Sequence, residues 1–450
     1  MKDFTLAEIA KACNGEYVGD ESLKNTKITS VERDSRQVNN GSLFLAIKGE
    51  RVDGHDFIEK CFAQGAVCAL CEKAPENATK PCIVVSSTLD AVKKIGRAYR
   101  EKFDIPVIGI SGSVGKTSTK EMLYAVLSQK FKTHKTQGNL NNELGVPLTL
   151  LSMPEDTEAA VIEMGISDFG EMTRLSEMVQ PTICVLTIIG ECHLENLGDR
   201  DGVLKAKTEM FKNARENADF ILNGDDDKLS TVKTVNGKKP VFFGLDAKND
   251  FYAKNIKNSG DGKVLATLCF DNNNIDVEIP AIGTYMVTNA LAAAAAGKLL
   301  GLTDEEIANG VASYKTVGSR ANVINTGKIK IIDDCYNANP TSVRASLDTL
   351  SNLDGRKVAI LGDMKELGSE ELKLHFDTGV YAKSKDIGTV ITVGELAKEL
   401  AKGADGKAFD TIEDAKPEIL KTIKSGDVVL VKASHSMQFE NIVEFLKQNF

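Results

Sequence analysis

The stretch Pro106-Val-Ile-Gly-Ile-Ser-Gly112-Ser-Val-Gly115-Lys116-Thr117 decides the fold of the central part of the chain. It begins with an apolar run that predicts a buried strand over residues 106–110. The glycines after it allow the backbone to approach a phosphate, whose oxygens the loop's N–H groups can surround. We therefore predict a phosphate-binding loop, in which Lys116 reaches the terminal phosphates of a nucleotide and the Thr117 hydroxyl binds Mg²⁺.

This loop departs from the strict phosphate-loop pattern, which has a glycine five residues before Gly115, because the chain carries Ile110 there. A glycine-rich turn that only caps a helix is the alternative. The next residues, 117–131, carry an apolar stripe that predicts a helix, formed by Met122, Leu123, Val126 and Leu127. The strand before the loop, the helix after it and the Lys-Thr pair in register favour phosphate binding, and hence an ATP-consuming enzyme.

Strands and helices alternate around this loop. Residues 159–163 and 183–189 predict two more strands, so we expect a mostly parallel sheet. Residues 250–280 alternate apolar and polar side chains and predict antiparallel hairpins at the edge of this domain, with turns at 258–262 and 272–274. An alanine-rich helix over 289–300 and a capping box that starts at Thr303 follow.

Two further α/β units flank the central one. The first contains predicted strands within 41–49, 66–71 and 82–85 and a helix over 56–64. The last contains predicted strands over 328–332, 357–361, 390–393 and 428–431, with helical segments between them. We therefore predict an α/β protein of three domains: a small α/β domain over residues 1–102, a central P-loop mononucleotide-binding domain over 103–314, and a Rossmann-like α/β domain over 315–450.

The composition excludes several classes of protein. Of the 450 residues, 42% are hydrophobic and 26% charged, as in an ordinary globular protein, and the net charge of -9 disfavours binding to nucleic acid. No apolar run reaches the roughly 20 residues of a membrane span, and the first residues lack a signal peptide's apolar stretch, so we expect a cytoplasmic protein. The nine cysteines are expected to be reduced, and the Cys68-x-x-Cys71 pair is better explained as buried strand residues than as a metal or redox site.

Several polar residues follow predicted strands or lie near domain junctions. Glu163 ends a strand and is a natural Mg²⁺ ligand, although it could instead cap a helix. His193 is a second metal candidate, but a lone histidine is usually structural. Asp334 could accept hydrogen bonds from ribose hydroxyls or cap the next helix, and Arg320 could bring charge to a phosphate or lie on the surface. Lys207 would ordinarily lie on a solvated helix face.

Amide side chains are concentrated just after the first helix of the central unit. Asn139, Asn141 and Asn142 lie within residues 139–147. Their carbonyl and NH₂ groups could contact a nucleotide or could only fix a turn, and we assign them to substrate binding.

Taken together, these motifs resemble the bacterial Mur ligase family, three-domain amide ligases of cell-wall synthesis. The resemblance covers nearly the whole chain. It rests on Asp34-Ser-Arg36, Gly41–Arg51 with Asp53–Phe57, Gly112–Thr117, Gly138–Glu143, Glu163-Met-Gly165, His193-Leu-Glu195, Lys205-Ala-Lys207, Asn289–Ala292, Asp334–Pro340 and Leu361–Gly368.

The resemblance implies a role for each domain. The first would hold a UDP-sugar through Ser35, Arg36, Lys48, Asp53 and His55. The loop Gly112, Ser113, Val114, Gly115, Lys116, Thr117 and Ser118 would bind ATP, with Asn289 on adenine and with Arg320 and Asp334 reaching the nucleotide from the third domain. Thr117, Glu163, His193 and Lys207 would form a site for two Mg²⁺ ions, with Lys207 carbamylated as in the wider superfamily. Lys116, Lys207 and His193 are the expected catalytic residues.

The resemblance also implies a reaction. A peptide carboxylate of UDP-N-acetylmuramoyl-tripeptide would attack the γ-phosphate of ATP to form an acyl phosphate, and the amine of D-alanyl-D-alanine would then displace phosphate. The third residue of the tripeptide is left open between lysine and diaminopimelate. The enzyme is expected to be a monomer.

Two other functions compete with this one. The ligase that adds the preceding diamino acid carries an Asp-Asn-Pro-Arg-type signature, whereas this chain has Asp334-Cys-Tyr-Asn-Ala-Asn-Pro340 in the comparable region. A nucleotide-hydrolysing switch would carry an Asn-Lys-x-Asp segment, which is absent from the sequence. Both observations favour the ligase that uses D-alanyl-D-alanine.

Overall fold

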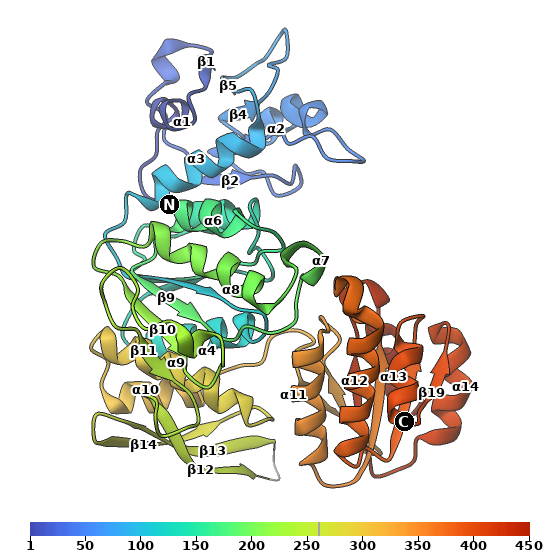
Figure 1. Ribbon diagram of the computed structural model, residues 1–450. Helices are drawn as coiled ribbons and strands as arrows, with labels where there is room; N and C mark the ends of the chain where they lie inside the picture. Colours follow the sequence, from blue (N-terminus) through green and yellow to red (C-terminus); the bar gives the residue numbers. More distant parts are fainter. Residues whose placement is uncertain (260–261) are drawn as a thin grey trace.

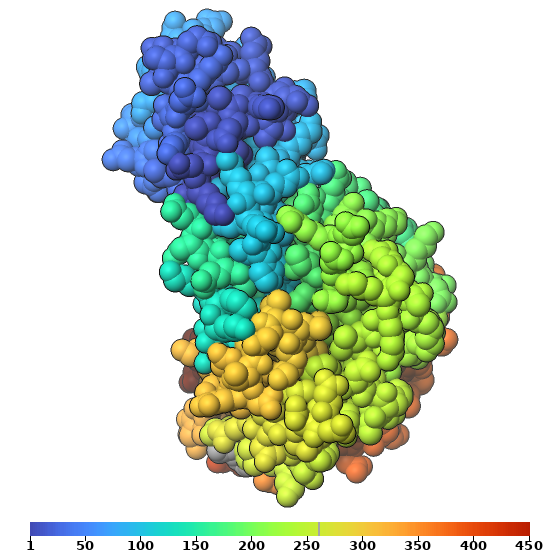
Figure 2. Space-filling model, turned by 90° about the vertical axis from the view of Figure 1, so that its left-hand side faces the viewer, coloured from blue at the N-terminus to red at the C-terminus, as the bar shows by residue number. Residues whose placement is uncertain are grey.

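The computed structural model describes residues 1–259 and 262–450. Figure 1 shows three domains in chain order: an N-terminal one in blue, a central one in green and yellow, and a C-terminal one in orange and red. The N-terminal domain projects from one end of the molecule, as the space-filling view in Figure 2 also shows. The C-terminal domain lies beside the central domain, near α7 (Leu194–Leu197). The predicted α/β class with three domains is confirmed.

The N-terminal domain contains one five-stranded sheet. Its strands, in spatial order, are β1 (Glu16–Val18), β5 (Cys82–Val84), β4 (Cys68–Cys71), β3 (Ser42–Leu45) and β2 (Ser30–Glu32). Only β1 runs antiparallel to its neighbour. The helices are α1 (Leu6–Cys13), α2 (Ile58–Gln64) and α3 (Thr88–Arg100). Cys68 and Cys71 are buried in β4, and all nine cysteines of the chain are free and buried, as the sequence predicted.

Helix α3 fastens this domain to the central one. Its last turn supplies Tyr99, whose hydroxyl accepts a hydrogen bond from the Lys2 N–H (2.7 Å) and donates one to the Met153 carbonyl (2.9 Å). The next residue, Arg100, is fully buried and donates to the Val179 carbonyl from Nε at 2.9 Å. One hydrophobic core therefore runs without interruption from α1 and α3 onto one face of the central sheet.

The central domain is built on six parallel strands. Their spatial order is β11 (Val241–Phe243), β10 (Asp219–Asn223), β9 (Ile183–Leu186), β6 (Val107–Ser111), β8 (Ala159–Glu163) and β7 (Thr133–Lys135). One face packs against α4 (Lys116–Leu127), α9 (Tyr285–Leu299) and α10 (Asp304–Ala312). The other face packs against α5 (Gly145–Leu151), α6 (Glu171–Val179) and α8 (Arg200–Thr208). The predicted parallel sheet is confirmed, with β9 ending three residues earlier than expected.

Residues 250–280 form antiparallel hairpins, as predicted. They build a separate sheet of β12 (Tyr252–Ser259), β13 (Lys263–Phe270) and β14 (Asn273–Ile279), which packs with α9 and α10 in one core. The second hairpin turns at Asp271 and Asn272, both with positive φ. The first predicted turn, at 258–262, includes residues 260 and 261, which lie outside the described residues. The capping box at Thr303 and Glu306 is present.

The C-terminal domain contains a second six-stranded sheet, in which only the edge strand β15 is antiparallel. The order is β15 (Asn322–Asn325), β16 (Lys330–Asp333), β20 (Asp427–Lys432), β17 (Arg356–Gly362), β18 (Thr389–Val393) and β19 (Lys407–Phe409). The helices are α11 (Pro340–Ser351), α12 (Glu371–Ser384), α13 (Ala397–Ala404), α14 (Ile412–Thr422) and α15 (Glu440–Asn449). Across the described parts of the chain, no helix combines the length and apolarity needed to cross a bilayer.

Candidate functional site

The glycine loop connects the central strand β6 to α4, which begins at Lys116. A Cβ atom at Gly112 would lie 1.9 Å from Thr187 Oγ1, and Gly115 has a φ of +83°, so both positions require glycine. Ser113 N–H donates to the Ile188 carbonyl (2.8 Å), which ties the loop to the segment after β9. Lys116 curls back over the loop, and its Nζ donates to the Gly112 carbonyl at 2.7 Å. The loop is therefore held open for an anion at the N-terminus of α4.

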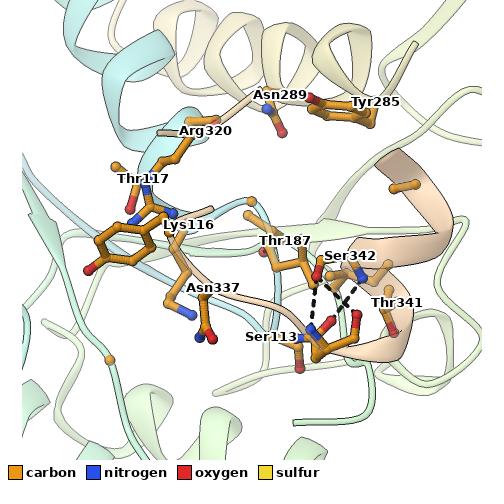
Figure 3. Close-up of a pocket in the computed structure, with 18 of the residues that line it drawn as sticks. Ser113, Lys116, Thr117, Thr187, Tyr285, Asn289, Arg320, Asn337, Thr341 and Ser342 are labelled. Atoms are coloured by element: carbon orange, nitrogen blue, oxygen red, sulfur yellow. Dashed lines mark hydrogen bonds between the residues drawn. The ribbon is translucent and has the colours of Figure 1, made fainter. Parts of the chain in front are cut away.

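A cavity of about 420 Å³ opens above this loop, between the central and C-terminal domains. Figure 3 shows Lys116 and Thr117 on one side of it, Tyr285 and Asn289 on α9, and Asn337, Thr341 and Ser342 contributed by the C-terminal domain. The lining includes these predicted site residues: Ser113, Val114, Gly115, Lys116, Thr117, Ser118, Asn141, Asn142, Glu163, His193, Asn289, Arg320 and Asp334. Residues from six separate sequence motifs, together with Arg320, thus share one cavity between two domains.

Glu163, at the carboxyl end of β8, faces Thr117. The Thr117 hydroxyl lies 3.1 and 3.0 Å from the two carboxylate oxygens, and Asn141 donates from Nδ2 to Oε1 at 2.9 Å. Lys120 Nζ lies 3.6 Å from Oε2. A hydroxyl and a carboxylate oxygen at this spacing suit Mg²⁺, which binds through few protein oxygens and keeps water and phosphate oxygens as its other ligands. No group of three or more metal-binding His, Cys, Asp or Glu side chains occurs within residues 1–259 and 262–450.

Lys207 is buried near Lys116 and His193, and His193 lines the cavity. The Lys207 side chain is only 1% exposed, so the ordinary expectation of a solvated helix face is wrong for this residue. Burial lowers the pKa of Lys207 to about 8, and the nearby Lys116 ammonium adds to the shift. Burial, with the Lys207 charge, also lowers the pKa of His193. His193 Nδ1 lies 2.6 Å from Glu366 Oε2, in a contact that is not aligned as a hydrogen bond.

The far wall of the cavity comes from α9 and the C-terminal domain. Asn289 accepts a hydrogen bond from the Thr119 hydroxyl (2.9 Å) and thereby orients its amide toward the loop. The Arg320 guanidinium lies 3.7 Å from the centroid of the Tyr336 ring, so this arginine is stacked and held at the cavity rather than free on the surface.

Asp334 is held by three contacts. It accepts hydrogen bonds from Lys432 Nζ (2.6 Å), Ser346 Oγ (2.7 Å) and the Ala321 N–H (3.1 Å). It does not cap α11, because Asn339 occupies that position. The carboxylate therefore lies at the cavity wall rather than at the end of a helix.

Other predicted substrate residues lie away from the cavity. The N-terminal set, Ser35, Arg36, Lys48, Asp53 and His55, does not line it. Arg36 is exposed and pairs with Asp34 at 2.7 Å. His55 is fixed within its own turn: Nδ1 lies 2.6 Å from Asp53 Oδ1, and Nε2 accepts from the Glu72 N–H at 2.9 Å.

Of the three asparagines, Asn139 is exposed and lies outside the cavity wall. Asn142 lines the cavity and also accepts from the Gly145 N–H (2.8 Å), so it fixes a turn at the start of α5. Asn141 is the one of the three that contacts Glu163.

Sequence reasoning assigned no role to several residues of the site. Tyr336, Asn337 and Thr341 line the cavity, and Lys120 contacts Glu163. Tyr336 and Asn337 lie inside the motif Asp334–Pro340, directly after a predicted strand. Their position could therefore have been used to predict them as site residues. Lys120 gave a weaker signal, a Lys-Glu pair directly before the apolar part of the predicted helix.

Comparison with known proteins agrees with this geometry. Three family models match: "Mur ligase family, catalytic domain" over residues 27–111, "Mur ligase middle domain" over 110–297, and "Mur ligase, glutamate ligase domain" over 319–435. The UDP-N-acetylmuramoyl-tripeptide–D-alanyl-D-alanine ligase of Bacillus subtilis (strain 168) is 36% identical over 98% of both chains.

Solved structures are similar along the whole length. MurF from Acinetobacter baumannii has a TM-score of 0.92 and 32% identity, covering 100% of this chain and 99% of that one. MurF ligase from Thermotoga maritima in complex with ADP has a TM-score of 0.84 and 30% identity, covering 93% and 97%.

Proposed function

The chain belongs to the Mur ligase family, and from that premise we infer that it joins D-alanyl-D-alanine to UDP-N-acetylmuramoyl-tripeptide in peptidoglycan synthesis, with ATP as the energy source. The observation that carries this inference is the shared cavity, in which the phosphate-binding loop of the central domain faces Arg320 and Asp334 of the C-terminal domain. Because the relatives match nearly end to end, the same three domains are available for two substrates and ATP.

The residues of the loop would hold ATP for transfer of its γ-phosphate. Lys116, whose Nζ now donates to the Gly112 carbonyl, would turn to the terminal phosphates and offset charge as the peptide carboxylate attacks. Thr117 and Glu163 would hold Mg²⁺, with His193 beside a second ion, and magnesium would neutralise phosphate charge in that step. The acyl phosphate then reacts with the dipeptide's amine to give the amide and phosphate.

Lys207 has properties that suit carbamylation. Within the described part of the chain its amine forms no hydrogen bond or ion pair, and its lowered pKa leaves much of the amine neutral near pH 8. A neutral amine adds CO₂ to give a carbamate and a proton, which replaces a buried cation by an anion next to Lys116. Growth with ¹³C-bicarbonate should produce a carbamate carbon signal that Lys207→Ala lacks, and equal signals in both proteins would exclude the modification.

The remaining assignments follow from the domain arrangement. We assign residues 1–102 to the UDP-sugar, with Ser35, Arg36, Lys48, Asp53 and His55 as contacts, and 103–314 to ATP. Residues 315–450 would close over the nucleotide and meet the dipeptide. Asn289 would contact adenine, and Asn139, Asn141 and Asn142 would contact the tripeptide substrate. The enzyme would act as a cytoplasmic monomer, and sedimentation at assay concentration tests the monomer.

The decisive experiment is a phosphate-release assay with each component omitted in turn. Phosphate release is expected to require ATP, Mg²⁺, UDP-N-acetylmuramoyl-tripeptide and D-alanyl-D-alanine together. Lysine and diaminopimelate forms of the tripeptide should be compared directly, since the ratio of their kcat/KM values identifies the third residue. Equal phosphate release without the dipeptide or without the tripeptide nucleotide would rule out the proposed function.

A further inference from the structure

A row of alternating charges runs from β7 across α4 to β8, and all of its members except Lys135 are buried. Lys135 of β7 pairs with Glu121 of α4, and Glu121 Oε1 lies 3.1 Å from Lys120 Nζ. Lys120 Nζ then lies 3.6 Å from Glu163 Oε2. The side chains of Lys120 and Glu163 are each only 1% exposed, so neither charge is compensated by bulk water.

Lys120 is in a position to control how Glu163 faces the loop. Within the described residues it is the only cation that pairs with Glu163 inside 4.0 Å. It approaches Oε2, while Asn141 donates to Oε1 and the Thr117 hydroxyl lies against both oxygens. The carboxylate is thus held by three different side chains, and Lys120 is the one that supplies charge.

Lys120 itself has little freedom to move. It sits on the face of α4 that packs against the sheet, between two carboxylates and with almost no exposed surface. Because the lysine side chain is held between two carboxylates, it can hold the Glu163 carboxylate in one orientation. Residues outside a metal site commonly orient the metal ligands in this way.

We propose that Lys120 is a positioning residue, which holds the Glu163 carboxylate turned toward Thr117 so that both oxygen donors are preset for Mg²⁺. The proposal rests on the proposed function, because that function assigns Glu163 to the metal. Loss of such a supporting partner commonly weakens metal binding by about 10–100-fold.

The test measures Mg²⁺-dependent binding of a non-hydrolysable ATP analogue to the full chain, without tripeptide or dipeptide, in Lys120→Met. The Mg²⁺ concentration for half-maximal binding should rise by about 10–100-fold, while binding at saturating Mg²⁺ is retained. A midpoint that is unchanged overturns the proposal. A midpoint that falls also overturns it, because the ammonium would then act only by repelling the metal.

Lys135→Met is the matched control. It removes the outer cation of the same row, which pairs with Glu121 and makes no ion pair with Glu163. Its Mg²⁺ midpoint should stay within about twofold of the parent even if its thermal stability falls. An equal shift in both variants would mean that Lys120 only stabilises the fold, and the proposal would fail.

Glu163→Gln separates this proposal from the proposed function. If Glu163→Gln leaves the Mg²⁺ midpoint unchanged, the metal assignment itself is wrong; if it shifts the midpoint while Lys120→Met does not, only the role of Lys120 is wrong. In the Glu163→Gln background, Lys120→Met should add no further shift, because Lys120 acts through Glu163. If Lys120→Met alone does not fold, the same measurements can be made on Lys120→Gln and on the double variant. The double variant leaves no unpaired charge between the two positions.

Discussion

His193 Nδ1 lies 2.6 Å from Glu366 Oε2, and this contact joins the central domain to the C-terminal domain directly beside the candidate reaction centre. Both residues have positive φ, 52° at His193 and 64° at Glu366, so each sits in a tight turn that aims it at the other. The turns themselves touch, since a Cβ on Gly368 would lie 3.2 Å from Glu195 Cα. Any movement of the C-terminal domain over the nucleotide must rearrange this junction.

Glu366→Gln should therefore loosen the domain junction with little effect on stability. Glu366 is 57% exposed, so loss of its contact with His193 is expected to change the free energy of unfolding by less than about 1 kcal/mol. The ligand-free variant should sample more open arrangements, measured as a larger radius of gyration in solution scattering. Glu370→Gln is the control, because Glu370 is equally exposed but pairs with Lys373 inside the same domain. An unchanged radius in Glu366→Gln would show that this contact does not hold the two domains together.

Gly112→Ala should abolish nucleotide binding. The added Cβ would lie 1.9 Å from Thr187 Oγ1 at a φ of +150°, so the loop and the segment after β9 must separate. We expect ATP affinity to fall by at least about 100-fold, measured by calorimetry, with a loss of stability of about 1–3 kcal/mol. Gly388→Ala is the control, since its Cβ would meet nothing within 4 Å and its φ is not positive. Normal ATP affinity in Gly112→Ala would show that the loop does not hold the phosphates.

The elements that the sequence predicted are those whose signal is local. β6, β8 and β9 are apolar runs buried on both faces, and the loop after β6 carries its glycines in the sequence itself. The short strands β1, β7, β11 and β19 were missed, because a three-residue segment at or near a sheet edge becomes a strand only through its neighbour.

The same difference between local sequence signals and tertiary packing applies to the residues of the site. Motif residues such as Thr117 and Glu163 could be proposed from their place after strands. Lys207 was proposed only from the resemblance to the family, and Lys120 was given no role, because a lysine on a predicted helix ordinarily indicates a solvated face. Their burial depends on which elements pack over them, and that is a property of the tertiary structure.

Asp334→Asn should destabilise the C-terminal domain more than its partial exposure suggests. Lys432, only 3% exposed, would lose its carboxylate partner at 2.6 Å and keep the Asn337 carbonyl at 2.8 Å. We expect a loss of about 2–4 kcal/mol in the free energy of unfolding. Asp334→Asn combined with Lys432→Met should recover part of that loss, since no unpaired buried charge then remains. A double variant as unstable as the sum of the two single variants would show that the pair is not coupled.

The pKa of Lys207 gives the protein a distinct dependence of stability on pH. The pKa is about 8 in the folded chain against an ordinary 10.5, so between these values the unfolded chain binds a proton that the folded chain has released. The free energy of unfolding should therefore rise as pH increases from about 8 to 10.5, by about 3 kcal/mol for this group. Below pH 8 both states are protonated, and the folded protein carries the full cost of a buried ammonium.

Lys207→Met should remove this rise and be more stable than the parent at pH 7, in denaturant titrations run in CO₂-free buffer. Lys205→Met, at an exposed position of the same helix, should keep the rise. A parent protein whose stability falls through this window would show that the Lys207 ammonium is stabilised rather than strained.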